Sequence, residues 1–390
     1  MDIDQIRSQF PGTSSVTHLI ASGAGLMPLP VTAAMSAHLE LEQRLGGYEA
    51  HAARADELDA VYADVASLLN AQPEEIALLE NATAAWCQAF YALPLKAGDR
   101  ILTCEAEYAA NYVAFLQRKK RDGIVIDVIP GTASGELDVQ ALEQMIDERV
   151  KLIAITWIPT NGGLVNPAEA VGRVASERGI PYLLDACQAI GQMPVDVQAL
   201  RCDFLSATGR KFLCGPRGTG FLYIRKPWVS RLEPAMIDHF AAPWVASDRY
   251  ELREDARRFE NWENSYALRA GLGAAIRHAM SVGLERIQER AWELADYART
   301  RIADIPGATV HDLGQRHCAI VSFTINGLDP AETVQSLRVQ HINIGASQPS
   351  STRLDAESRN LPALLRVAPH YYNTSDEIDV LIQALNTLRD

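Results

Sequence analysis

The sequence predicts an α/β fold in which a large domain holds a mostly parallel sheet of seven strands and a small α+β domain follows. Short β-rich runs alternate with helical stretches between residues 75 and 224. Several runs, such as residues 152–155, are continuously apolar, which is typical of parallel strands covered by helices on both faces. After about Leu272 the pattern changes to long helices with isolated strands.

Each element follows from local pattern and punctuation. In the large domain we expect strands at residues 75–79, 100–104, 124–129, 152–157, 182–185, 203–206 and 220–224, and helices at 56–69, 111–119, 139–146 (with Asp138 as N-cap) and 167–177. In the small domain we expect a helix at 270–305, broken near Gly283, a strand at 319–324, a helix at 330–339, strands at 342–344 and 365–369, and a helix at 376–388. The large domain would comprise residues 16–270, and the small domain residues 1–15 and 271–390.

Composition narrows the class of protein. The 390 residues are 48% hydrophobic, which excludes a disordered chain and allows two sizeable cores. The chain has 36 Lys and Arg against 49 Asp and Glu, a net charge of −13. Its one short basic run, residues 118–121, is interpreted as a solvated helix end, so no nucleic-acid partner is expected.

No membrane, disulfide or metal signal is present in the sequence. No apolar run approaches the ~18 residues that span a bilayer, and the N-terminal residues 1–5 are acidic where a secretory signal would be basic. The six cysteines are scattered without a CxxC pair. We therefore expect a cytoplasmic protein with reduced thiols, no membrane partner and no metal site.

Two charged residues stand close to the ends of predicted strands. Lys211 lies between a strand and a Gly/Pro-rich turn. Desolvation there would lower the pKa of its amine, as a Schiff-base lysine requires, although a surface lysine in a hairpin fits the same pattern. Asp185 ends an apolar strand. Its carboxylate could hold a cationic ring nitrogen, or it could cap a following helical turn.

Other donors near these strands suit a phosphate group. Thr83 and Thr208 offer hydroxyls and Arg210 a guanidinium. The glycines of residues 215–220 suggest a nucleotide loop, but a strand follows them instead of a helix, so the segment is interpreted as a tight turn. An amine, an acid and phosphate donors are the requirements of pyridoxal 5′-phosphate (PLP).

The chain resembles the class V (cysteine desulfurase-like) aminotransferases, a family of fold-type I PLP enzymes, from His18 to the last helix. Its most specific motifs are residues 185–188 with 191–197, residues 206–220, and the run Tyr-Tyr-Asn-Thr at 371–374. The resemblance implies the fold-type I PLP-transferase fold. It also implies PLP as cofactor, a small amino-acid-like substrate and a homodimer.

The resemblance assigns roles to single residues. Lys211 would be the Schiff-base lysine and Asp185 the partner of the pyridinium nitrogen. Arg366 would grip the substrate α-carboxylate with its guanidinium fork, whereas taken alone it also fits a surface strand arginine. The other implied cofactor-binding residues are Thr83, Tyr108, Thr160, Gln188, Thr208 and Arg210. The candidates for the substrate pocket are Tyr48, Trp86, Asn161 and Arg353.

Three departures from the desulfurase pattern bear on function. Tyr108 stands where desulfurases stack a histidine on the cofactor ring, and a tyrosine is a weaker base near neutral pH. The loop at residues 345–353 lacks the persulfide-forming cysteine of desulfurases. Glu263 stands where they offer a phosphate-binding threonine from the partner subunit, and a carboxylate would repel phosphate.

The runs at residues 46–50, 258–263 and 370–374 look most like hercynylcysteine sulfoxide lyases and isopenicillin N epimerase-like proteins. We therefore predict a PLP-dependent lyase that cleaves the Cβ–S bond of an S-substituted cysteine or cysteine sulfoxide. Lys211 would remove the Cα proton before β-elimination. The alternatives are a PLP-dependent epimerase or aminotransferase, and a non-catalytic member that keeps the fold to bind a partner.

Overall fold

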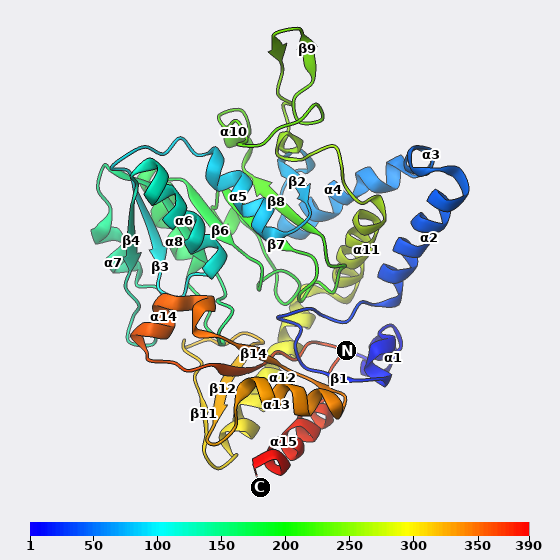
Figure 1. The fold of residues 1–390 in the computed structure, drawn as a ribbon, viewed down its shortest axis with the longest axis vertical. Coiled ribbons are helices and arrows are strands. Elements are labelled where there is room, and N and C mark those ends of the chain that lie inside the picture. The colour runs from blue at the N-terminus through cyan, green and yellow to red at the C-terminus, as the bar shows by residue number, and fades with distance from the viewer. Residues whose placement is uncertain (390) are drawn as a thin grey trace.

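A seven-stranded sheet forms the centre of the molecule in a computed structural model, which describes residues 1–389 (Figure 1). Its strands in spatial order are β2 (Ile76–Leu79), β8 (Gly220–Ile224), β7 (Phe204–Thr208), β6 (Tyr182–Asp185), β5 (Val150–Thr156), β3 (Arg100–Cys104) and β4 (Val125–Ile129). β8 is antiparallel to both of its neighbours, and the other adjacent pairs are parallel. The predicted mostly parallel sheet is confirmed, with all seven strands close to their predicted positions.

Continuously apolar strands bury both faces of this sheet. In β5, Leu152 and Ala154 pack into one apolar cluster, whereas Ile153 and Ile155 pack into another on the opposite face. The first cluster includes residues of α5 (Ala82–Ala92), α6 (Ala109–Asp122) and α10 (Lys226–Val229). The second includes residues of α4 (Ala55–Leu69), α7 (Val139–Met145), α8 (Ala168–Arg178), α9 (Val197–Leu200) and α11 (Tyr266–Val282).

Several elements of the structure were not predicted. Among them are α2 (Leu29–Leu45), α3 (Gly47–Ala53), α5 and the hairpin of β9 (Trp244–Ala246) and β10 (Arg249–Tyr250), which projects from the body of the molecule in Figure 1. In α2 only Val31 and His38 are buried, so an apolar stripe is absent. In α5 nearly every residue is apolar or small, so polar and apolar residues do not alternate with a helical period that could predict it.

The small C-terminal domain is built on a second, antiparallel sheet. Its strands in spatial order are β11 (Ala308–Val310), β12 (Val321–Ile325), β15 (Leu364–Val367) and β14 (Gly345–Ser347). The accompanying helices are α12 (Leu284–Ala303), α13 (Pro330–Val339), α14 (Arg353–Ser358) and α15 (Ser375–Arg389). The predicted break in the long helix is confirmed, since Gly283 with φ of +94° separates α11 from α12.

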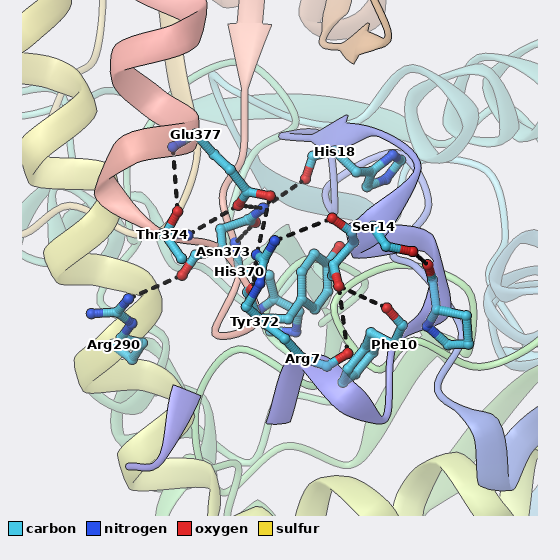
Figure 2. Close-up of polar contacts among 12 residues, drawn as sticks. Arg7, Phe10, Ser14, His18, Arg290, His370, Tyr372, Asn373, Thr374 and Glu377 are labelled. Atoms are coloured by element: carbon cyan, nitrogen blue, oxygen red, sulfur yellow. Dashed lines mark hydrogen bonds and ion pairs between the residues drawn. The ribbon is translucent and has the colours of Figure 1, made fainter. Parts of the chain in front are cut away.

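The N-terminal segment joins this small domain. After α1 (Ile3–Ser8), strand β1 (Thr17–His18) pairs in parallel with β13 (Ile342–Asn343), and the N-terminus lies beside the small domain in Figure 1. Figure 2 shows the polar contacts that hold the segment there. Arg7 donates to the Tyr372 carbonyl (2.9 Å) and pairs with Glu377 (3.1 Å). Asn373 donates to the His18 carbonyl (3.2 Å) and to Glu377 (2.8 Å).

His370 connects the same cluster to the turn that carries Lys211. Its buried ring places Nε2 at 2.6 Å from the Phe212 carbonyl oxygen. Burial lowers the pKa of His370 to about 3, so the ring is neutral and donates this hydrogen bond. The Tyr-Tyr-Asn-Thr motif and its preceding histidine therefore link both termini to the centre of the molecule.

The basic run at residues 118–121 is only partly as predicted. Its last three residues are exposed, but Arg118 is buried and donates to the carbonyls of Leu93 (2.9 Å) and Leu95 (3.0 Å). It also pairs with Asp122 at 2.5 Å. The prediction of a fully solvated end was wrong for Arg118, because its planar fork satisfies carbonyls left free after α5.

All six cysteines are free thiols in the structure. No helix within residues 1–389 is both long enough and apolar enough to cross a membrane.

Gly172 in α8 tests the close contact between α8 and α9. A Cβ at this position would lie 1.8 Å from the Leu200 carbonyl oxygen, whereas a Cβ at Gly47 would meet no atom within 4 Å. Gly172→Ala should lower the free energy of unfolding by about 1–3 kcal/mol, because the helices must move apart. Gly47→Ala serves as the control and should leave the free energy of unfolding unchanged or slightly raised. Thermal and urea denaturation measure both, and equal stabilities would contradict the packing described.

His370 also predicts a pH dependence of stability. Its pKa is about 3 in the folded chain and 6.5 when exposed, so the unfolded state binds more protons between these values. The resulting stabilisation is complete above pH 6.5 and is lost as the pH falls toward about 3. His370→Gln keeps a donor for the Phe212 carbonyl but cannot titrate. Urea denaturation across this range should show a shallower acid loss for the variant, and parallel curves would exclude this role.

Candidate active site

A cavity of about 330 Å³ opens where the carboxyl ends of β6 and β7 meet the N-terminus of α5. Parallel strands end at the same edge of a sheet, which is where ligands bind in open α/β folds. Five predicted site residues line it: Thr83, Tyr108, Thr208, Arg210 and Lys211. The structure therefore brings together residues that are up to 128 positions apart (211 minus 83).

Lys211 lies in the tight turn that follows β7. The Gly215 N–H donates to the Gly209 carbonyl (2.8 Å) and the Cys214 N–H to the Lys211 carbonyl (2.9 Å), which confirms that residues 215–220 are not a nucleotide loop. Burial lowers the pKa of the Lys211 amine, while the neighbouring Cys187 and Asp185 act in the opposite direction. This desolvated position favours a reactive amine over a surface lysine.

Asp185 is 5% exposed and uses its two oxygens differently. Oδ1 accepts from the Cys187 N–H (2.9 Å), and Oδ2 accepts from Asn111 Nδ2 (2.9 Å). Asp185 therefore caps the following turn and still presents a carboxylate within the site, so the two sequence interpretations are compatible. Asn111 was not predicted, and its only sequence signal is its place four residues after Glu107, one helical turn away.

One end of the cavity suits a phosphate. Asn81 caps α5 by accepting from the Ala84 N–H (2.9 Å), which leaves the first turn at Thr83 facing the cavity. Arg210 donates to the Gly23 carbonyl. Burial lowers the pKa of Arg210, and the second cause is the nearby Arg217, a residue of the cavity that sequence analysis missed. Two guanidinium groups beside a helix N-terminus form a positive site for a dianion.

Gln188 provides a further test of whether PLP fits. Its Nε2 donates to the Ser22 carbonyl (3.2 Å), but its Oε1 is buried without a partner. An unpaired buried acceptor is costly, and a ring hydroxyl is a donor that could satisfy it. With the amine, the carboxylate and the phosphate donors, the residues present fit PLP.

Arg366 on β15 is held by the backbone and side chain of Thr160. Its Nη1 donates to the Thr160 carbonyl (2.7 Å) and to Oγ1 (2.5 Å), while its buried Nε has no partner. Burial lowers the pKa of Arg366 to about 10, which still leaves it charged at neutral pH, and it is not a surface arginine. The Thr160 hydroxyl accepts from Arg366 in this structure, and its predicted contact with the cofactor stays a prediction.

Asn161 and Arg353 differ in how the structure uses them. Asn161 is buried, donates to Thr352 Oγ1 (2.9 Å) and accepts from Ser347 Oγ, so its amide holds the loop that follows β14. The Arg353 side chain is 66% exposed and pairs with Glu357 at 2.7 Å. The prediction that Arg353 lines the pocket is not met here, because a carboxylate one turn along α14 binds it.

Two other pocket candidates lie elsewhere. Trp86 is 2% exposed and packs against Phe90 and Phe115, so its prediction as a pocket residue was wrong: it belongs to the core beneath α5 and α6. Tyr48 is 74% exposed on α3 and borders a separate cavity, which it shares with Glu263.

Tyr108 precedes α6 and is 36% exposed at the cavity. Burial raises the pKa of its phenol, with the Asp185 charge as the next cause, so the ring is neutral. Glu263 lies outside this cavity, in a neighbouring one of about 290 Å³ that shares Glu80 and Gly218 with it. Within one chain, the Glu263 carboxylate therefore lies in a different cavity from the residues that would bind the phosphate.

A desolvated lysine and a buried aspartate lie at the carboxyl edge of the sheet, beside two guanidinium groups that suit a phosphate. This arrangement is that of a fold-type I PLP enzyme. The chain matches the family model "Aminotransferase class-V" over residues 18–381. It therefore belongs to the class V aminotransferase family, and its cofactor is PLP.

Similar proteins agree with this assignment. A probable cysteine desulfurase of Methanothermobacter thermautotrophicus is 29% identical over 100% of this chain and 98% of its own length. Another from Xylella fastidiosa is 32% identical over 85% and 80%. A cysteine desulfurase structure from Thermococcus onnurineus superposes with a TM-score of 0.91, at 25% identity over 99% and 97%. These relatives do not support the closer resemblance to hercynylcysteine sulfoxide lyases or epimerases.

Lys211→Ala tests the amine assignment. The purified variant should lose the covalent bond to PLP, so that cofactor leaves on gel filtration even after borohydride reduction, and turnover should fall by roughly 10²–10⁴-fold or more. Lys226→Ala is the control, since that side chain is 73% exposed after β8. Visible absorbance and mass spectrometry measure attachment. Cofactor retained covalently by the Lys211 variant would refute the assignment.

Proposed function

We propose that this chain is a PLP-dependent carbon–sulfur lyase that cleaves the Cβ–S bond of an S-substituted cysteine or cysteine sulfoxide by β-elimination. The observation that carries the proposal is the desolvated Lys211 amine beside the buried Asp185, in a family whose compared members include cysteine desulfurases. The balanced reaction consumes one water and gives a thiol (a sulfenic acid from a sulfoxide), pyruvate and ammonia.

We assign each step of substrate binding and proton transfer to a residue of this chain. Arg366, fixed by Thr160, would bind the substrate carboxylate through the donors that Thr160 leaves free. PLP, when bound, supplies an electron sink for the substrate carbon. Lys211 would remove the Cα proton, because desolvation raises the fraction of neutral amine. Tyr108 keeps its proton and covers the site as an aromatic ring.

The loop after β14 supports a lyase without a persulfide relay. Desulfurases of this family use a loop cysteine, but residues 345–353 contain none. Asn161 binds both Ser347 and Thr352, so the loop is tied down beside Arg366, whose strand pairs with β14. The thiol that lines the cavity is Cys187, and burial raises its pKa well above the usual value, which makes it a poor nucleophile.

We also infer a homodimer. Exposed aromatic side chains at Tyr48 (74%) and Trp262 (42%) line a further cavity of about 620 Å³, which Glu263 also borders. Large exposed aromatic groups around a concave surface are typical of protein interfaces. In a dimer this face would be covered, and Glu263 would lie at the subunit interface.

A product assay tests the lyase. The enzyme loaded with PLP should release pyruvate and ammonia in equal amounts from S-alkyl cysteines or their sulfoxides, together with the thiol or sulfenic acid. Arg366→Gln should raise KM by one to two orders of magnitude, since a charge-assisted hydrogen bond to the carboxylate is worth about 1.5–3 kcal/mol. Coupled lactate dehydrogenase absorbance and an ammonia assay provide the measurement.

Two other products distinguish the alternatives. Deuterium incorporation at Cα with the sulfur group retained would replace the lyase by an epimerase or aminotransferase. Alanine formed from free cysteine, without pyruvate, would replace it by a desulfurase. Arg353→Gln is the matched control, because that exposed arginine pairs with Glu357 and should leave KM unchanged.

A further inference from the structure

Asn111 lies between two buried carboxylates. Its Nδ2 donates to Glu107 Oε1 (2.9 Å) and to Asp185 Oδ2 (2.9 Å), so the two hydrogens of one amide serve two acids. Glu107 is 3% exposed, Asn111 3% and Asp185 5%. They come from neighbouring parts of the site, since β6 ends at Asp185 and α6 begins just after Glu107.

Glu107 is surrounded by neutral donors. Oε1 also accepts from the Tyr108 N–H (2.9 Å) and Thr156 Oγ1 (2.5 Å), and Oε2 accepts from Thr103 Oγ1 (2.9 Å). The hydrogen bonds to Glu107 come from hydroxyl, amide and backbone donors and not from an arginine or lysine, although burying a carboxylate without a cation is expensive. Such a group is retained where its charge or its geometry serves a function.

The field of Glu107 acts on Asp185. Burial is the largest cause that raises the pKa of Glu107, and the Asp185 charge acts in the same direction, so the two carboxylates interact electrostatically. A second negative group behind Asp185 strengthens the attraction of Asp185 for a cation in front of it. The other titratable groups that interact with this pair are Cys104, beside Glu107, and Tyr108, Cys187 and Lys211, beside Asp185. Arg210 and Arg366 act in turn on Tyr108 and Lys211.

We propose that Glu107 is a positioning residue that acts through the Asn111 amide on Asp185 and thereby keeps the ring nitrogen of PLP protonated. Through its contact with the Tyr108 N–H, the same carboxylate also fixes the start of α6 and with it the aromatic ring at the cavity. The inference rests on the proposed role of Asp185, but it does not depend on which sulfur compound is the substrate.

Glu107→Gln is the geometry-preserving test. Its retained Oε1 can still accept from Asn111, Thr156 and the Tyr108 N–H, while the new amide can donate to Thr103 Oγ1, so that mainly the charge is removed. Asn111→Ala removes the connection and leaves the other Glu107 donors in place. Asp185→Asn is the reference, and Glu105→Gln, two residues away and half-buried, is the control.

The measurement is the ¹⁵N chemical shift of the ring nitrogen of labelled PLP bound to each variant, without substrate. Glu107→Gln and Asn111→Ala should each move the resonance toward the unprotonated position seen with Asp185→Asn, and Glu105→Gln should not. The double variant should shift no further than Asn111→Ala alone, because both changes interrupt one route.

Other results would overturn the inference. A Glu107→Gln resonance at the wild-type position would make Glu107 structural only, and additive shifts in the double variant would exclude the route through Asn111. An unchanged resonance in Asp185→Asn would instead refute the role of Asp185, which distinguishes the two failures. If Glu107→Gln does not fold, Asn111→Ala decides, since a wild-type resonance there also contradicts the proposal.

Discussion

The Asp185 carboxylate is buried at the carboxyl end of β6, and the rest of the site is arranged around that charge. Strand register places it opposite Thr156 of β5 and Ser206 of β7, in the middle of the sheet. Taking such a group out of water costs several kcal/mol unless donors or a cation compensate. Asn111 and the Cys187 N–H supply donors, and the ring nitrogen of PLP would supply the positive charge.

The N-terminal segment completes the site although it belongs to the small domain by its pairing. Residues 22–25 contact two parts of the site. The Ser22 carbonyl accepts from Gln188 after β6, whereas the Gly23 carbonyl accepts from the Arg210 side chain and the Gly25 N–H donates to the Arg210 carbonyl, next to Lys211. A Cβ at Gly25 would lie 2.7 Å from the Lys211 carbonyl oxygen, so only glycine allows this approach. The cluster in Figure 2 anchors the segment, which couples both domains to the cofactor site.

Membership of the class V family accounts for the cofactor, whereas the proposed reaction rests on the departures from the desulfurase pattern. Tyr108 in place of a histidine, a loop without cysteine and Glu263 in place of a threonine are the departures, and they leave Lys211 and Asp185 in place. A common PLP fold can support β-elimination, racemisation or sulfur transfer. In each of these reactions the cofactor ring can accept the electron pair that a broken bond leaves on the substrate carbon. The side chains around that carbon select among them.

The sequence alone predicted the seven strands, the break at Gly283 and the turn after β7, because hydrophobic period and Gly/Pro turn signals are local properties. The roles of Lys211, Asp185 and Arg366 are proposals that rest on the resemblance of their motifs to the family. Tertiary structure decided the rest. Arg118 and Trp86 are buried, contrary to their predictions. Thr160 accepts a hydrogen bond from Arg366, and Asn111 donates to both Glu107 and Asp185. Sequence periodicity does not predict these contacts, because they depend on how separate elements pack. The distances between such residues are set only when the sheet, the helices and the N-terminal segment come together.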